Sequence, residues 1–222
     1  MIVYLLQLVA WMVFMAVLLL WPAGTFAYPA AWILIGIFAI GGVAMIVWLS
    51  KRSPRLLRER MALPVQRAQE PWDRIWLSIF MLAFFVWMAF MSWDAARNSF
   101  TAIPAWLQML GGLAIVLEML GVAWTFRENT FAAPVVKIQE DQRVIDTGPY
   151  AAVRHPMYAS ALLFFIGLPL LLGSWIGLAL SILFILGMAW RAVHEERALR
   201  AKLTGYEDYA ARVPYRFVPY VW

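Results

Sequence analysis

The sequence contains no cysteine, which excludes disulfide bonds, thiol nucleophiles and metal sites built on thiolates. It contains only two histidines, His155 and His194, and their wide separation argues against a histidine metal centre. Glycine-rich nucleotide-binding loops and a Ser-His-Asp pattern are also missing. We therefore expect no metal, and no chemistry that depends on these motifs.

Charge is scarce as well, because only 14% of the residues are charged, whereas soluble domains carry roughly a quarter. The chain is 64% hydrophobic, and its mean hydropathy is +0.74. These values predict an all-α integral membrane protein. The net charge of +5 is compatible with nucleic-acid binding, but its distribution indicates membrane topology instead, so we expect membrane lipids and no nucleic acid as partners.

Four stretches have the length and apolar character of membrane-spanning helices, which need about 20 apolar residues. They cover about residues 2–21, 30–50, 75–93 and 104–124. Tryptophans lie near their ends, as in an interfacial aromatic belt: Trp21, Trp32, Trp48, Trp76, Trp93, Trp106 and Trp124. We interpret the first stretch as an anchor. The alternative, a signal peptide cleaved near Ala27, lacks a basic region and has too long an apolar run.

The basic residues predict the orientation. Segments 51–74, 125–156 and 191–222 hold seven, four and six Lys or Arg, whereas 94–103 holds only Arg97 and 22–29 holds none. With alternating spans, every basic residue except Arg97 lies on one side. The positive-inside rule makes that side cytoplasmic, so we expect both termini in the cytoplasm, with the chain in a bacterial inner membrane.

Residues 157–190 must then cross the membrane an even number of times, because both flanking segments are basic. This stretch is too short for two full spans with a turn at about 20 residues each. Pro169 and Gly173 lie near its middle. We expect a tight, partly sunken helical hairpin, which would bring His155 and Glu195 together at the cytoplasmic surface.

Three polar segments add detail. In 51–74, Leu56, Leu57 and Met61 share a helical face, which predicts either a short helix in the headgroup region or only a basic loop that sets topology. Pro71 marks the restart into the third span. Residues 191–212 are predicted to be one helix that Val213-Pro214 ends.

The first candidate site is Arg154-His155-Pro156. Proline is favoured in the first turn of a helix, so His155 is expected at the cap of the first hairpin helix, where free amides attract anions. Tyr158 lies three residues further on the same face. The structural alternative is a snorkelling arginine with interfacial aromatics that anchor the helix.

The second candidate site lies in the tail, where Arg191 and Glu195 have the i,i+4 spacing of a helical pair. Glu196 has the same spacing to Arg200, and we expect that pair to be an ordinary surface ion pair. Adjacent acids beside the membrane suit a cationic ligand such as S-adenosylmethionine. Glu118 is the only acid within a clear span, and we expect it to be either a polar wall of the pocket or a neutral acid bonded to the backbone.

A set of motifs carries a family resemblance: Gly148-Pro149-Tyr150, Arg154-His155-Pro156-Met157-Tyr158, Glu195-Glu196-Arg197-Ala198-Leu199 and Tyr206…Tyr209…Arg212-Val213-Pro214. The combination resembles the isoprenylcysteine carboxyl methyltransferase family, whose core the membrane phospholipid N-methyltransferases share. With Arg52–Arg60 and Pro71-Trp72-Asp73 it covers about residues 50–219. Leu203-Thr204-Gly205 departs from the family's Phe-Gly, which puts the helix register after Leu199 in question.

The resemblance implies a methyltransferase core at 51–222 behind an N-terminal transmembrane hairpin at 1–50. It also implies an S-adenosylmethionine pocket formed by Gln142, Val144, Ile145, Tyr150, His155, Pro156, Met157, Tyr158, Glu195 and Glu196. Arg191 would be the catalytic residue that holds the carboxylate of the methyl acceptor.

We therefore expect an S-adenosylmethionine-dependent methyltransferase that acts on a lipophilic acceptor, in the first place an isoprenylcysteine-like carboxylate. Methyl transfer to a carboxylate needs an aligned, desolvated nucleophile and no strong acid or base. The alternatives are a phospholipid N-methyltransferase, an NADPH-dependent membrane reductase, and a small transporter or scaffold.

Overall fold

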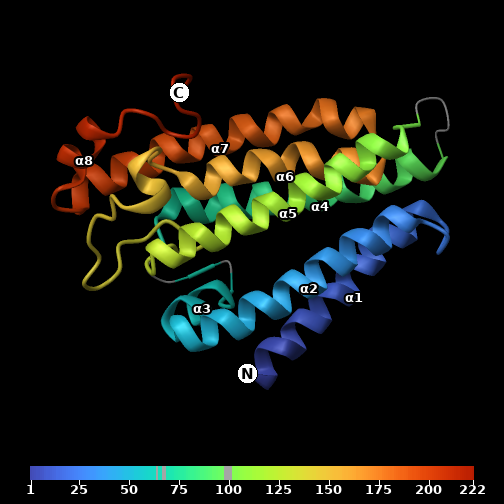
Figure 1. Cartoon of the computed structure of the whole chain (residues 1–222), viewed down its shortest axis with the longest axis horizontal. Helices are drawn as coiled ribbons and strands as arrows, with labels where there is room; N and C mark the ends of the chain where they lie inside the picture. The colour runs from blue at the N-terminus through green and yellow to red at the C-terminus, as the bar shows by residue number, and fades with distance from the viewer. Residues whose placement is uncertain (64, 67–68, 98–101) are drawn as a thin grey trace.

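The computed structural model describes residues 1–63, 65–66, 69–97 and 102–222. Within these residues the chain forms eight α-helices and one 3₁₀ helix, with no β-strand (Figure 1). The predicted all-α membrane fold is therefore confirmed.

Five helices are long and apolar enough to cross a bilayer. They are α1 (Ile2–Ala23), α2 (Pro29–Arg52), α4 (Pro71–Arg97), α5 (Ala105–Glu128) and α7 (Trp175–Lys202). The first four confirm the predicted spans, and most extend beyond the predicted ends by up to about one turn. The restart at Pro71 is also confirmed, because α4 begins there.

The uncharged segment forms a hairpin of α6 (Pro156–Leu172) and α7, as predicted. The turn needs only two residues, since Gly173 adopts a left-handed φ of 91° and Ser174 caps α7 by accepting a hydrogen bond from the Gly177 amide at 2.9 Å. The turn joins the 17-residue α6, which is shorter than a full span, to the 28-residue α7, and how deeply the hairpin enters the membrane stays a prediction.

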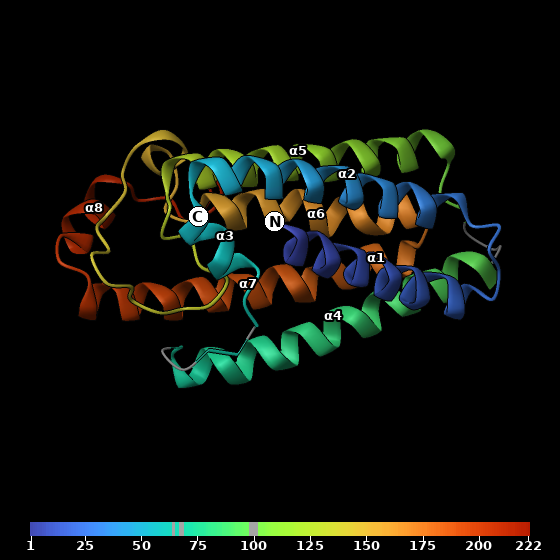
Figure 2. The same ribbon diagram turned by 90° about the horizontal axis from the view of Figure 1, so that it is seen from below.

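The hairpin turn reaches the end of the bundle where α1 joins α2. There the Tyr28 hydroxyl donates to the carbonyl of Leu172, and the Ser174 hydroxyl donates to Asp94 Oδ2 at 2.6 Å. At the other end lie α3 (Pro54–Arg60), the segment 129–147 and α8 (Tyr206–Arg212), as Figures 1 and 2 show.

The tail differs from the single helix that was predicted. Helix α7 ends at Lys202, residues 203–205 break the helix with Gly205 at a φ of 81°, and α8 follows. The break falls at the place where the sequence departs from the family pattern. The predicted end at Val213-Pro214 is confirmed.

Close packing of α5 on α6 depends on glycine, and the two helices run side by side in both views (Figures 1 and 2). A Cβ added to Gly111 would lie 2.5 Å from the Leu171 amide nitrogen and 2.6 Å from the Gly167 carbonyl oxygen. Such distances leave no space for a side chain, so the small residues set this helix separation.

Helix α3 confirms the short helix expected in the basic loop. Ser53 caps it by accepting from the Leu56 amide at 3.4 Å. Leu56 and Leu57 are buried in a cluster with Ile46 and Phe126. The apolar face of α3 therefore packs on α2 and α5 and does not lie in lipid.

Candidate active site

One pocket lies where α6 begins, covered by the segment 129–147 and bounded by α7 and α8. Ten of the eleven predicted site residues line it: Gln142, Val144, Ile145, Tyr150, His155, Pro156, Met157, Tyr158, Arg191 and Glu195. The eleventh, Glu196, does not. The hairpin thus brings the two motifs together, and the chemical roles of these residues remain predictions.

His155 caps α6 and Pro156 is the first helical residue, as the Arg-His-Pro motif predicts. The imidazole makes no capping hydrogen bond. Its Nε2 lies 3.1 Å from Glu196 Oε1, and its ring stacks on Tyr158 with centroids 5.3 Å apart and planes 2° apart. His155 is therefore fixed on both sides and forms a rigid part of the pocket wall.

The Tyr158 hydroxyl joins the two candidate charged residues of α7. It donates to Glu195 Oε2 at 2.6 Å and accepts from Arg191 Nη1 at 2.6 Å. Within the described part of the chain Arg191 and Glu195 make no direct ion pair, although they have the i,i+4 spacing of one. A tyrosine hydroxyl between them orients both groups toward the pocket.

The acid that pairs with Arg191 is Asp73, in the first turn of α4, whose side chain is 0% exposed. Asp73 Oδ1 accepts from Arg191 Nε at 2.7 Å. Its Oδ2 accepts from the Val136 amide and from Gln69 Nε2, both at 2.8 Å. Asp73 therefore links α4, α7 and the segment over the pocket. The sequence interpretation noted Asp73 only in a helix-start motif.

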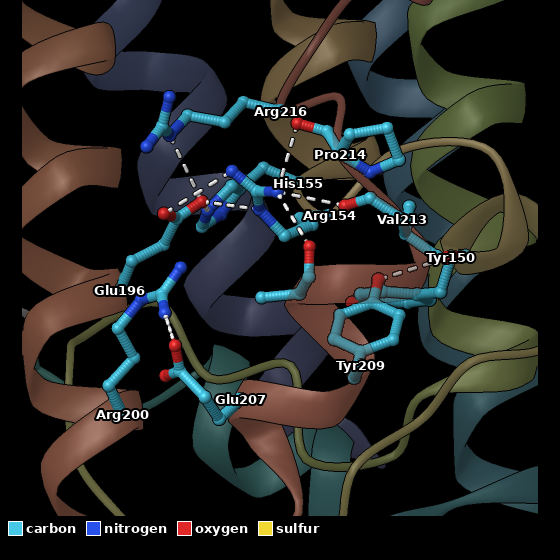
Figure 3. Close-up of polar contacts among 11 residues, drawn as sticks. Tyr150, Arg154, His155, Glu196, Arg200, Glu207, Tyr209, Val213, Pro214 and Arg216 are labelled. Carbon is cyan, nitrogen blue, oxygen red and sulfur yellow. Dashed lines mark hydrogen bonds and ion pairs between the residues drawn. The ribbon is translucent and has the colours of Figure 1, made fainter.

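Arg154 lines the pocket next to His155 and holds the C-terminal segment in place (Figure 3). Its Nε donates to Glu196 Oε1 at 2.7 Å, and its Nη1 donates to the carbonyls of Val213 at 2.8 Å and Pro214 at 2.9 Å. Arg216 Nε also donates to Glu196 Oε1, at 3.2 Å. Buried arginine, histidine and glutamate thus satisfy one another.

The predicted surface pair between Glu196 and Arg200 is wrong. Glu196 is only 3% exposed and points toward Arg154, whereas Arg200 pairs with Glu207 of α8 (Figure 3). The reason is that leaving the buried guanidinium of Arg154 without an anionic partner costs about 3–5 kcal/mol, far more than an exposed helical pair of about 0.3–0.5 kcal/mol contributes.

Tyrosines form the wall of the pocket on the side of α8. The Tyr150 hydroxyl accepts from Asn129 Nδ2 at 2.8 Å, and burial raises the pKa of Tyr150 to about 12, so this hydroxyl stays protonated. The Tyr206 hydroxyl is buried and has no hydrogen-bond partner among the described residues. Since buried polar atoms are nearly always paired, this hydroxyl has a hydrogen available for an acceptor bound in the pocket.

Glu118 fits neither expectation. It lies in a second cavity of about 450 Å³ between α2 and α5, away from the first pocket, and the described residues offer it no hydrogen bond. The walls of this cavity are otherwise apolar. Among the described residues no group of three or more His, Asp or Glu side chains is arranged to hold a metal ion.

Residues 106–204 match the phospholipid methyltransferase family (PEMT), which is less than half of the chain. The chain is also similar to the cobalt-zinc-cadmium resistance protein CzcN of Cupriavidus metallidurans, with 27% identity over 108 residues. That similarity covers 46% of this chain and 48% of the relative, about half the length of each protein. The family match and the five spanning helices indicate a membrane methyltransferase.

Proposed function

We propose that the protein is an S-adenosylmethionine-dependent methyltransferase that methylates a lipophilic acceptor, in the first place the carboxylate of an isoprenylcysteine-like compound. The observation that carries the proposal is a single pocket in which a carboxylate, an arginine and tyrosine hydroxyls meet, inside a segment that matches a methyltransferase family.

The donor set of the pocket fits the cofactor. Glu195 offers a carboxylate to the cationic amino or sulfonium group, and the Tyr206 hydroxyl has a free hydrogen for a ribose or base oxygen or nitrogen. Val144, Ile145 and Leu199 offer apolar contacts to an adenine ring. When bound, S-adenosylmethionine supplies an electrophilic methyl group.

Arg191 is proposed to hold the carboxylate of the acceptor. A guanidinium has five N–H donors, and three are used by Asp73, Tyr158 and the Pro134 carbonyl at 3.0 Å. The remaining donors can bind an oxyanion, and the fixed partners orient them. Arginine keeps its charge throughout, so it positions the carboxylate without acting as an acid or a base.

Glu196 is proposed to act on the cofactor only through His155. Its carboxylate holds His155 Nε2 and Arg154 and therefore fixes the start of α6. This is a positioning role, in place of the direct cofactor contact that the family resemblance implied.

Cofactor binding is expected to move the segment 129–147. The pocket has a volume of about 110 Å³, well below the roughly 300–1,000 Å³ of small-molecule sites. Because this segment supplies much of the lining, its displacement is the simplest way to enlarge the pocket.

The basic end of the bundle that carries the pocket is proposed to face the cytoplasm of a bacterium, with both termini there. A phospholipid amine is the second candidate acceptor, and the match to the phospholipid methyltransferase family favours it. A reductase is disfavoured because Glu195 would face the phosphates of NADPH.

Ligand binding to the purified protein in detergent tests this proposal. S-adenosylhomocysteine should raise the unfolding temperature, and Glu195→Gln should weaken its binding by about 10- to 100-fold, as loss of a charged hydrogen bond does. The matched control is Glu207→Gln, an exposed acid of α8, which should bind normally. Stabilisation by NADPH alone would instead support the reductase.

A further inference from the structure

Arg60, the last residue of α3, lies between the two cavities of the molecule. Its guanidinium carbon is 4.3 Å from the centroid of the Phe126 ring, and Phe126 lines the cavity between α2 and α5. Its Nη2 contacts Met157 Sδ at 2.8 Å, and Met157 lines the methyltransferase pocket. Arg60 therefore marks the place where the two cavities approach each other.

Unlike the other inward-facing cations, Arg60 has no acidic partner among the described residues. Lys137 pairs with Glu59, Arg154 with Glu196, and Arg191 with Asp73. Arg60 contacts only an aromatic ring and a thioether, and its Nε is buried without any hydrogen bond. Arg60 hydrogen-bonds no acid among the residues described, so its guanidinium has donors available for an anion that comes from outside the chain.

The electrostatic surroundings of Arg60 also favour binding of an anion. Burial, together with the neighbouring Arg191, lowers the pKa of Arg60 to about 10, although Tyr150, Tyr158 and Glu195 oppose the shift. The group therefore stays cationic at neutral pH and lies within electrostatic range of the pocket residues. An anion bound to it would sit beside the site of methyl transfer.

The cavity between α2 and α5 suits a hydrocarbon chain. Its lining is apolar except for Glu118, and its volume of about 450 Å³ is in the range of small-molecule sites. Gly41, Gly42 and Ala44 of α2 keep that wall thin, and apolar residues of α5 face them. Within a bilayer such a cavity can admit a lipid chain while the charged head stays near the polar end of the bundle.

We infer that Arg60 binds the oxyanion of an acidic amphiphile, a carboxylate or a phosphate, whose hydrocarbon chain occupies the cavity between α2 and α5. The inference rests on the proposed function, because it assigns this amphiphile as the methyl acceptor, whose oxyanion would be shared between Arg60 and the unused donors of the neighbouring Arg191. A planar guanidinium whose Nε has no hydrogen-bond partner among the described residues can bind either oxyanion.

The experiment measures binding of non-reacting probes by calorimetry in a nonionic detergent. The carboxylate probe is S-farnesylthioacetate, the phosphate probe is dodecyl phosphate, and the neutral controls are farnesol and dodecanol. Wild-type protein should bind at least one anion more tightly than its neutral counterpart. Arg60→Met should weaken the binding of that anion by about 10- to 100-fold and leave the binding of the neutral probe unchanged. Arg58→Met, an exposed position on α3, is the matched control and should bind like wild type.

The two probes distinguish the possible acceptors. If Arg60→Met weakens binding of the farnesyl carboxylate only, the result supports a prenylated acid as the acceptor. If it weakens binding of the phosphate only, the result supports a phospholipid. Anion binding by Arg60→Met within twofold of wild type would overturn the inference. If Arg60→Met does not fold, equal affinities of wild type for the anionic and neutral probes would overturn it.

A separate measurement, of cofactor binding, shows whether the proposed function itself fails. S-adenosylhomocysteine binding is measured on the same wild-type sample, and it does not depend on Arg60. Absence of cofactor binding with retained, Arg60-dependent anion binding would refute the methyltransferase proposal and leave an anionic-lipid site.

Discussion

Removing the carboxylate of Asp73 should destabilise the protein strongly, because Arg191 would be left as a buried charge without its acid. Asp73 is 0% exposed and makes three hydrogen bonds, one of them to the Arg191 guanidinium at 2.7 Å. Breaking a buried ion pair by removing one partner costs about 3–5 kcal/mol. At roughly 2–4 °C per kcal/mol for a chain of this length, Asp73→Ala should lower the unfolding temperature by on the order of 10 °C.

A double-mutant cycle shows whether the stability lost in Asp73→Ala comes from the ion pair with Arg191. Arg191→Ala in the Asp73→Ala background removes the unpaired charge, so the double variant should be more stable than the sum of the single losses predicts. The expected coupling is about 1–3 kcal/mol, followed by tryptophan fluorescence during thermal unfolding in detergent. Asp208→Ala, an exposed acid of α8, is the control and should stay within about 0.5 kcal/mol of wild type. Additivity of the Asp73 and Arg191 losses to within about 0.5 kcal/mol would refute the reasoning.

Three further outcomes are expected. Gly111→Ala should lower stability by about 1–3 kcal/mol because the new methyl group meets the backbone of α6, whereas Gly36→Ala, which meets nothing within 4 Å, should be neutral or slightly stabilising in the same unfolding assay. Cofactor binding should change the rate of trypsin cleavage after the exposed Arg143, and an unchanged rate would contradict movement of the covering segment. Glu196→Gln should weaken S-adenosylhomocysteine binding and stability together, since Arg154 loses its anionic partner; normal stability would argue against this buried pair.

Much of the fold could be predicted because membrane insertion depends on properties visible in the sequence. Apolar length gave the four spans, and the position of Arg97 relative to all other basic residues predicted their alternation. The same charges required residues 157–190 to double back. The two-residue turn at Gly173 and the extent of α7 beyond its apolar part could not be predicted, because both depend on local capping and packing.

Some residues of the candidate site could be predicted from the sequence and others could not. The motif residues around His155 and Glu195 could be found because they are clustered in the sequence, and the structure places them in one pocket. Asp73 and Arg60 were missed because their partners are distant in sequence and are chosen by tertiary packing. Local spacing was misleading for Glu196, since the i,i+4 rule describes exposed helical pairs and this residue faces Arg154.

The ion pair between Asp73 and Arg191 also affects how the protein is made. The two residues are 118 positions apart, so at 5–20 residues per second the ribosome adds the arginine roughly 6–24 s after the aspartate. During this delay the start of α4 carries an acid whose partner does not yet exist. Translation that stops before α7 therefore yields a product in which the Asp73 carboxylate has, among the described residues, only Gln69 and the Val136 amide as partners and lacks its cation.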